Sequence, residues 1–159
     1  MRPATLAKSA AAVLVTGAVG GLASRPAENG WYAKLRKPSF QPPRQAFPIV
    51  WPLLYADIAA VSAATVDELE DQRRLDKASA FRRALALNLM LNASWSWLFF
   101  NRRMLGTSAI AAAALTASSA DLTRRAVEVR PGRGAPLALY PLWCAFATVL
   151  STRIWMLNR

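Results

Sequence analysis

Histidine is absent from this chain of 159 residues, and cysteine occurs only once, as Cys144. Histidine is the commonest ligand of haem and metal ions, and no cluster of carboxylates and cysteine replaces it, so we expect no bound metal and no resident cofactor. A lone cysteine cannot form an intramolecular disulfide, which leaves the redox compartment open. The sequence also shows no pairing of a nucleophile with a general base, so acid–base catalysis is not expected.

Charged residues are missing from long stretches of the chain. Residues 9–24, 84–101, 104–120 and 134–152 contain none, and residues 45–66 contain only Asp57. About 17–25 mostly apolar residues cross a bilayer core, whereas a soluble bundle would carry charges along one face of every helix. The sequence therefore predicts an all-α integral membrane protein that forms a single domain, residues 1–159. We expect five transmembrane helices, at residues 5–23, 46–66, 84–101, 105–123 and 137–157.

The formal net charge is +11, from 20 basic and 9 acidic residues. In a soluble protein this balance would suggest a nucleic-acid partner. Here the basic residues lie mainly between the apolar runs and form no face that is interleaved with aromatic residues. We therefore expect them to contact the headgroups of the lipid membrane, and we expect no nucleic-acid partner.

Residues 25–45, which we call the aromatic loop, make the first long connection. The loop contains four prolines together with Trp31, Tyr32 and Phe40. Flexible linkers are rich in glycine and serine and lack aromatic residues, so we expect this loop to be stiff and to fold over the mouth of the bundle as a lid. Residues 67–83 mix acidic and basic residues and are interpreted as a solvated helical connection.

Three of the predicted helices carry large side chains at helical spacing. The positions are Asn88, Asn92, Trp95 and Phe99 on one helix, Tyr140, Trp143, Ala147 and Leu150 on another, and Trp51 and Tyr55 on a third. Amides in hydrocarbon need hydrogen-bond partners. Hydrogen bonds between helices and hydrogen bonds to a ligand are equally good explanations of the two asparagines. Aromatic stripes likewise occur both in packed cores and in pocket walls. Helices 5–23 and 105–123 lack such faces, and we expect them to serve as packing.

The aromatic and proline residues also form a longer pattern. It comprises Trp31-Tyr32, Lys37-Pro38, Pro42-Pro43, Phe47-Pro48, Trp51 and Leu54-Tyr55, then Asn92, Trp95, Phe99 and Phe100, and finally Tyr140, Trp143, Phe146-Ala147-Thr148 and Leu150. In this order the pattern resembles the signature of the translocator protein family, also called the tryptophan-rich sensory proteins or peripheral-type benzodiazepine receptors.

The resemblance implies a homodimer of five-helix chains, each with a pocket that the first loop caps. In the family this pocket binds porphyrins and isoquinoline or benzodiazepine-type ligands. The implied ligand-binding residues are Trp31, Tyr32, Pro42, Phe47, Trp51, Tyr55, Asn92, Trp95, Phe99, Trp143, Phe146, Ala147 and Leu150. Some members are proposed to use tryptophans at the positions of Trp51 and Trp143 in porphyrin breakdown, so these two are the candidate catalytic residues.

The run Leu150-Ser151-Thr152-Arg153 lacks the tyrosine of the cholesterol pattern found in mitochondrial members,. This departure argues against sterol binding and favours a bacterial-type member in the bacterial cell membrane. Asp57 is also unexpected at its place; we expect it to face the interior or a wet cavity, without a catalytic role.

The resulting hypothesis is a membrane protein that binds, and translocates or scavenges, porphyrins and similar large apolar ligands, with a stress-sensing or regulatory role. Without histidine, a porphyrin or haem-like ligand would be held by stacking and burial, with its carboxylates near Lys34, Arg36 or Arg44. Two alternatives stay open. One is an enzyme that degrades porphyrin with light and oxygen, and the other is a small exporter or structural protein with no tetrapyrrole role.

Overall fold

The computed structural model describes residues 1–25 and 30–159, and within these residues the secondary structure is helical, with no strand. The five long helices are α1 (Pro3–Ser24), α3 (Phe47–Asp71), α4 (Leu75–Ser96), α5 (Leu105–Val129) and α7 (Leu139–Asn158). The short ones are α2 (Trp31–Lys34), the 3₁₀ turns η2 (Arg44–Ala46) and η4 (Ala135–Ala138), the π-helix η3 (Trp97–Asn101), and α6 (Pro131–Gly134). The predicted all-α class is confirmed.

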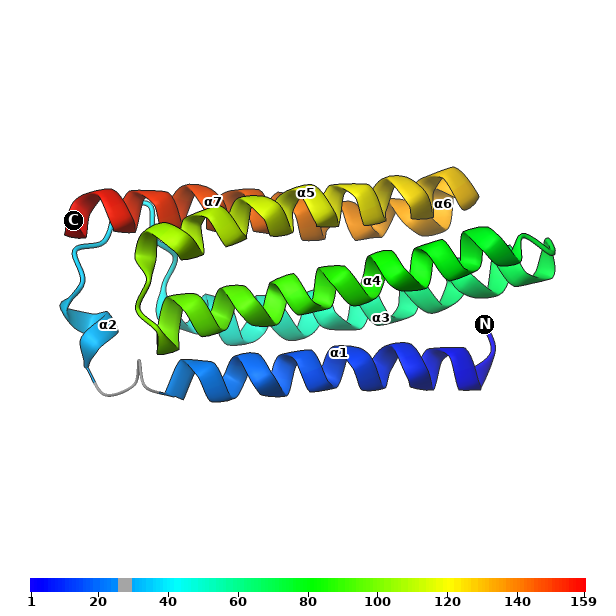
Figure 1. Cartoon of the computed structure of the whole chain (residues 1–159), viewed down its shortest axis with the longest axis horizontal. Coiled ribbons are helices and arrows are strands. Elements are labelled where there is room, and N and C mark those ends of the chain that lie inside the picture. The colour runs from blue at the N-terminus through cyan, green and yellow to red at the C-terminus, as the bar shows by residue number, and fades with distance from the viewer. Residues whose placement is uncertain (26–29) are drawn as a thin grey trace.

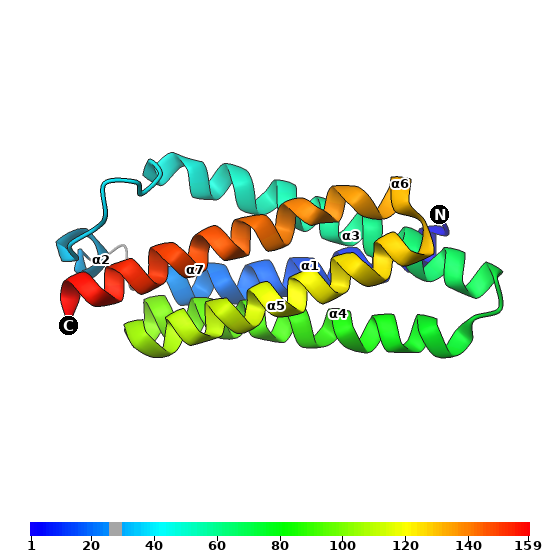
Figure 2. The ribbon, with the colours of Figure 1, turned by 90° about the horizontal axis from the view of Figure 1, so that it is seen from above.

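Successive long helices run in opposite directions along one axis (Figure 1). The N-terminus, the α3–α4 turn and α6 lie at one end of the bundle, which we call the N-terminal end. The C-terminus, α2 and the turn between η3 and α5 lie at the other end, which we call the C-terminal end (Figures 1 and 2). The connections therefore alternate between two ends, as they do in a chain that crosses a bilayer repeatedly.

Among the described residues, three stretches are long and apolar enough to cross a membrane: Pro3–Ser24, Arg44–Asp71 and Pro131–Asn158. Helices α4 and α5 have similar lengths but contain more polar residues. Several of these polar groups are satisfied inside the bundle, as Asn88 is by Ser119. Charged residues near the N-terminal end, such as Arg82 on α4 and Asp121 on α5, lower the hydropathy of these two helices further. Within the described residues, five long helices lie where five were expected, and three of them meet the hydropathy of a membrane span.

The helices extend beyond the apolar runs that predicted them. Residues 67–83 were expected to be a solvated helical connection. Most of them are helical, but they continue the two long helices, since α3 reaches Asp71 and α4 begins at Leu75. Ion pairs support the added turns, because Arg2 and Arg82 both bind Glu70. A charge-free run marks the part of a helix that lies in hydrocarbon, and it does not mark where the helix ends.

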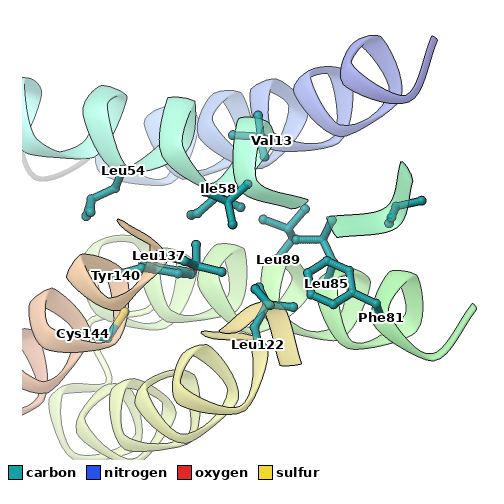
Figure 3. Close-up of a cluster of buried hydrophobic side chains, with 14 of the residues drawn as sticks. Val13, Leu54, Ile58, Phe81, Leu85, Leu89, Leu122, Leu137, Tyr140 and Cys144 are labelled. Carbon is teal, nitrogen blue, oxygen red and sulfur yellow. The ribbon is translucent and has the colours of Figure 1, made fainter. Parts of the chain in front are cut away.

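Aliphatic packing fills the bundle from its centre to its N-terminal end. Leu85 and Leu89 of α4 lie close to Leu122 of α5 and to Ile58 of α3 (Figure 3). A second cluster, built around Trp95, lies towards the C-terminal end, where aromatic side chains replace aliphatic ones. Bulky rings that meet at an angle leave more space between them than interlocked leucines do, so this second half can hold a cavity.

Candidate ligand cavity

A cavity of about 830 Å³ lies between the long helices in the C-terminal half of the bundle. This volume is within the range of roughly 300–1,000 Å³ that is typical of small-molecule sites. The cavity is bounded by residues of α1, α3, α4, η3 and α7, with Tyr32 from α2 and Arg44 from η2. Most of the predicted ligand-binding residues line it: Tyr32, Phe47, Trp51, Tyr55, Trp95, Phe99, Trp143, Phe146, Ala147 and Leu150.

The other three predicted residues lie outside the lining. Trp31 packs its ring edge-on against Phe99, with centroids 6.3 Å apart. Pro42 lies in the aromatic loop ahead of η2, and Asn92 is buried behind Tyr55, whose hydroxyl donates a hydrogen bond to Asn92 Oδ1 at 3.1 Å. Trp31 and Asn92 therefore contact lining residues without forming the cavity surface, and Pro42 lies outside the lining.

The aromatic lining forms two groups. On α3 and α4, the ring of Trp51 lies 5.5 Å from that of Tyr55 and 6.4 Å from that of Trp95, centroid to centroid. On α7, the ring of Trp143 lies 5.4 Å from that of Phe146. Flat ring faces of this kind suit a planar apolar ligand, which gains both buried area and ring-to-ring contacts.

Helix α1 contributes more to the cavity than its sequence indicated. We expected it to serve as packing, yet Ala10, Leu14, Gly17, Ala18 and Gly21 all line the cavity. Small side chains leave room next to the helix backbone, so the residues that indicate close packing in a sequence also create space for a ligand. Whether small residues on α1 serve close packing or leave room for a ligand depends on which helices lie beside them, and the sequence alone does not give that arrangement.

Phe100 is a further lining residue that was absent from the predicted set. It follows Phe99 directly, and both are in the π-helix η3, where the Arg102 N–H donates to the Trp97 carbonyl at 2.9 Å. The wider turn of a π-helix changes the faces that consecutive residues present, and such bulges are frequent at functional sites. No residue pattern in this stretch predicts the π turn.

The described part of the aromatic loop, residues 30–45, packs at the C-terminal end of the bundle, while residues 26–29 lie outside the described residues. The Tyr32 ring contacts the rings of Phe99 and Phe100, at 6.1 and 5.8 Å between centroids. Its hydroxyl accepts a hydrogen bond from Gln41 Nε2 at 2.9 Å. Burial raises the pKa of Tyr32 above that of a free tyrosine, so the phenol stays neutral in the cavity wall,.

The same loop is tied to the end of α7 through one side chain. Asn158 Oδ1 accepts a hydrogen bond from the Arg36 backbone N–H at 2.9 Å, and Asn158 Nδ2 donates to the Arg36 carbonyl at 2.8 Å. Two bonds to the backbone of a single residue fix the height of the loop above α7. Asn158 is thus the tether of the aromatic loop.

Charge is concentrated at one point of the cavity. Arg44 is the charged residue among the described residues that line it, whereas Lys34 and Arg36 are exposed outside the lining. Lys37 lies 4.6 Å from the Tyr32 ring centroid, and burial, together with nearby Arg44, lowers the pKa of Lys37. Asp57 lies outside the lining, half-buried on α3.

The cavity reaches the surface of the bundle beside α1 and α3. Leu14 and Gly21 on α1 line the cavity, and both are exposed, with 71% of Leu14 accessible. On α3, Pro48, Pro52 and Ala56 are likewise both lining and exposed. An apolar ligand in the bilayer therefore meets cavity-lining residues at the lipid-facing surface.

A multi-pass helical bundle with an aromatic cavity defines a class: small integral membrane proteins built around an internal apolar site. The particular family follows from the comparison with known proteins. Residues 9–156 match the TspO/MBR family model, and the chain belongs to this family.

Relatives occur in mammals and in bacteria. The chain is 34% identical to a translocator protein of Bos taurus over 131 residues, which is 81% of this chain and 75% of the relative. It is 29% identical to the protein CrtK of Rhodobacter capsulatus over 143 residues, 89% and 85% of the two chains. It is also 28% identical to a tryptophan-rich sensory protein of Cereibacter sphaeroides over 128 residues, 80% and 77% of the two.

Proposed function

We propose that the cavity binds one porphyrin or a similar large, flat tetrapyrrole within the membrane, and that the protein translocates or scavenges such ligands. The observation that carries the proposal is a cavity of about 830 Å³ with aromatic groups on α3 and α4 and again on α7. The ring of a porphyrin offers flat apolar faces to such walls. Membership in a family whose relatives include translocator and sensory proteins supports it further.

Binding in this site would rest on burial and stacking. The sequence has no histidine to serve as an axial ligand of a central metal, so a metal-free porphyrin should bind as well as its metal complex. A peripheral carboxylate of the ligand could pair with Arg44, the cation in the lining. Because Arg44 is exposed, such a pair would orient the ligand more than it would strengthen binding,.

A titration with metal-free protoporphyrin tests the proposal. Protein in nanodiscs should show saturable quenching of its tryptophan fluorescence, because Trp51, Trp95 and Trp143 line the cavity. The Ala147→Phe substitution should weaken binding by about tenfold or more, since it adds a ring to the cavity lining one helical turn from Trp143,. The matched Ala113→Phe substitution, on an exposed face of α5, should leave affinity unchanged. Quenching that does not saturate would favour an exporter or structural role without tetrapyrroles.

Light- and oxygen-dependent degradation of the bound porphyrin is a second candidate function. It is favoured by one observation, that Trp51 and Trp143 line the same cavity from α3 and α7. The double variant Trp51→Phe and Trp143→Phe should then slow the loss of porphyrin absorbance under light and oxygen at equal occupancy. Unchanged rates and products in this variant would reject the enzymatic role.

Homodimerisation is a further part of the proposal and rests on the family resemblance. The mass of the protein in nanodiscs or native membranes, measured after mild crosslinking, should correspond to two chains. A mass of one chain at all crosslinker concentrations would reject it.

A further inference from the structure

A series of hydrogen bonds, which we call the polar chain, runs from the cavity wall into the centre of the bundle. The Tyr55 hydroxyl on α3 donates to Asn92 Oδ1 on α4 at 3.1 Å. Asn92 Nδ2 donates to the Tyr140 hydroxyl on α7 at 2.9 Å, and that hydroxyl donates to Asn88 Oδ1 at 2.9 Å. Asn88, Asn92 and Tyr140 are at most 1% exposed, so solvent offers these groups no alternative partners.

The direction of the polar chain is fixed at its far end, on α5. The Ser119 hydroxyl donates to the Leu115 carbonyl at 2.7 Å, which leaves its oxygen to accept from Asn88 and from the Cys144 thiol 3.7 Å away,. Asn88 Nδ2 faces Ser119 Oγ at 3.0 Å and Ser118 Oγ at 3.2 Å, which matches the two hydrogens of an amide nitrogen. The reversed amide would set its oxygen against the lone pairs of Ser119. The Asn88 oxygen therefore faces Tyr140.

This orientation determines every bond that follows. Because Tyr140 gives its hydrogen to Asn88, its oxygen must accept from the amide nitrogen of Asn92. The oxygen of Asn92 then faces Tyr55 and takes the hydrogen of its hydroxyl. Hydrogen bonds aligned in one direction polarise one another, which strengthens each donation along the series. At the cavity end, the Tyr55 hydroxyl hydrogen is donated to Asn92, so only the lone pairs of its oxygen remain to bond a ligand.

We infer that the polar chain makes Tyr55 a hydrogen-bond acceptor in the cavity, so that the site favours flat apolar ligands with an N–H or O–H group over equally sized ligands with acceptors alone. The inference rests on the proposed function, because it describes which ligand the cavity prefers. Tyr140, Asn88 and Ser119 do not line the cavity. They are positioning residues, which set the ligand preference through Tyr55.

Three rigid tricyclic ligands of nearly equal shape test the inference. Carbazole presents an N–H donor, dibenzofuran presents an oxygen acceptor, and fluorene presents neither. Affinities are measured by calorimetry on protein in nanodiscs, with empty nanodiscs as the blank for partition into lipid. The Tyr55→Phe substitution should weaken carbazole by about two- to tenfold, the contribution of one hydrogen bond, and should leave fluorene unchanged.

Tyr140→Phe separates positioning from contact. Without the Tyr140 hydroxyl, the Asn92 amide is free to reverse, so the ratio of carbazole to fluorene affinity should fall although no cavity residue has changed. Thr116→Val is the matched control. It removes a partly buried hydroxyl that bonds Thr148 at 3.0 Å between α5 and α7, outside the polar chain, and it should preserve the wild-type ratio.

The possible outcomes are distinct. A wild-type ratio in both tyrosine variants, or a loss of dibenzofuran affinity in place of carbazole affinity in Tyr55→Phe, would overturn the inference while the proposed function stands. If none of the three ligands binds saturably while protoporphyrin does, the inference fails and the proposed function stands. If protoporphyrin does not bind saturably either, both fail. If the Tyr140→Phe variant misfolds and therefore loses fluorene binding, the ratio of carbazole to fluorene affinity in Tyr55→Phe decides the test alone.

Discussion

Gly17 and Gly21 lie one helical turn apart on α1, but their surroundings differ. A Cβ atom at Gly17 would lie 3.1 Å from Tyr55 Cε2, whereas a Cβ at Gly21 would meet nothing within 4 Å. Tyr55 is held on its far side by its bond to Asn92, so it has little freedom to retreat. We expect Gly17→Val to lower the free energy of unfolding by about 1–3 kcal/mol relative to Gly21→Val, measured by thermal unfolding in detergent. Equal stabilities would show that Tyr55 can shift freely.

Asn92 illustrates how far single residues can be predicted. Its spacing from Asn88, Trp95 and Phe99 placed these residues on one face, and two interpretations remained, a bond between helices or a polar spot in a pocket. The structure shows bonds from Asn92 to Tyr55 and Tyr140, outside the lining. Helical periodicity identifies a shared face, but what that face contacts depends on the neighbouring helices.

Helices α5 and α6 meet at a glycine that tolerates no side chain. A Cβ atom at Gly134 would lie 2.5 Å from the backbone carbon of Ala126 and from the backbone nitrogen of Val127, while one at Gly132 would meet nothing within 4 Å. Backbone cannot move aside as a side chain can. We expect Gly134→Ala to destabilise the protein by about 3 kcal/mol or more and Gly132→Ala to be neutral, as measured by thermal unfolding. A neutral Gly134→Ala would mean that the α5–α6 turn is more open.

The aromatic loop depends on its tether to α7. Asn158→Ala removes both hydrogen bonds to the Arg36 backbone, so amides near residue 36 should exchange faster with deuterium and bound ligand should dissociate sooner. Asn101→Ala, at the same end of the bundle on η3, is the control for loss of an asparagine side chain. The interpretation of the loop as a lid would be rejected if Asn158→Ala changed exchange near residue 36 but not ligand dissociation.

At the level of elements, the sequence predicted the five long helices and missed their ends and the π turn. Charge-free runs located the helices because hydrocarbon excludes charge. They could not show that α3 continues to Asp71, because the last turns are held by contacts with Arg2, which is remote in sequence. The π-helix at Trp97–Asn101 likewise has no local signature.

The two ends of the molecule are held by different forces. At the N-terminal end, Arg2 pairs with Glu70 and Asp71, and Arg130 pairs with Glu68. The two arginines and Asp71 are exposed and the two glutamates are partly exposed, so salt screens these pairs and each contributes little,. The C-terminal end is held by ring contacts and the Asn158 tether, and it contains the cavity.

This division predicts where a ligand acts. Bound porphyrin should slow deuterium exchange in residues 10–24 of α1 and 47–59 of α3, which border the cavity, and should leave residues 67–82 unchanged. Exchange mass spectrometry of the protein in nanodiscs, with and without ligand, measures both regions. Glu70→Gln, which alters only the N-terminal end, should leave ligand affinity at its wild-type value. Uniform protection along the chain would contradict this division.

The open side of the cavity has a consequence for purification. Because exposed residues of α1 and α3 line both the cavity and the lipid-facing surface, the tail of a detergent or lipid can enter the site while the protein is extracted. A purified sample would then contain a bound detergent or lipid molecule, and a titration would measure the displacement of that molecule by the added ligand. Apparent affinities should depend on the tail length and concentration of the solubilising agent, so the same ligand would give different constants in different micelles.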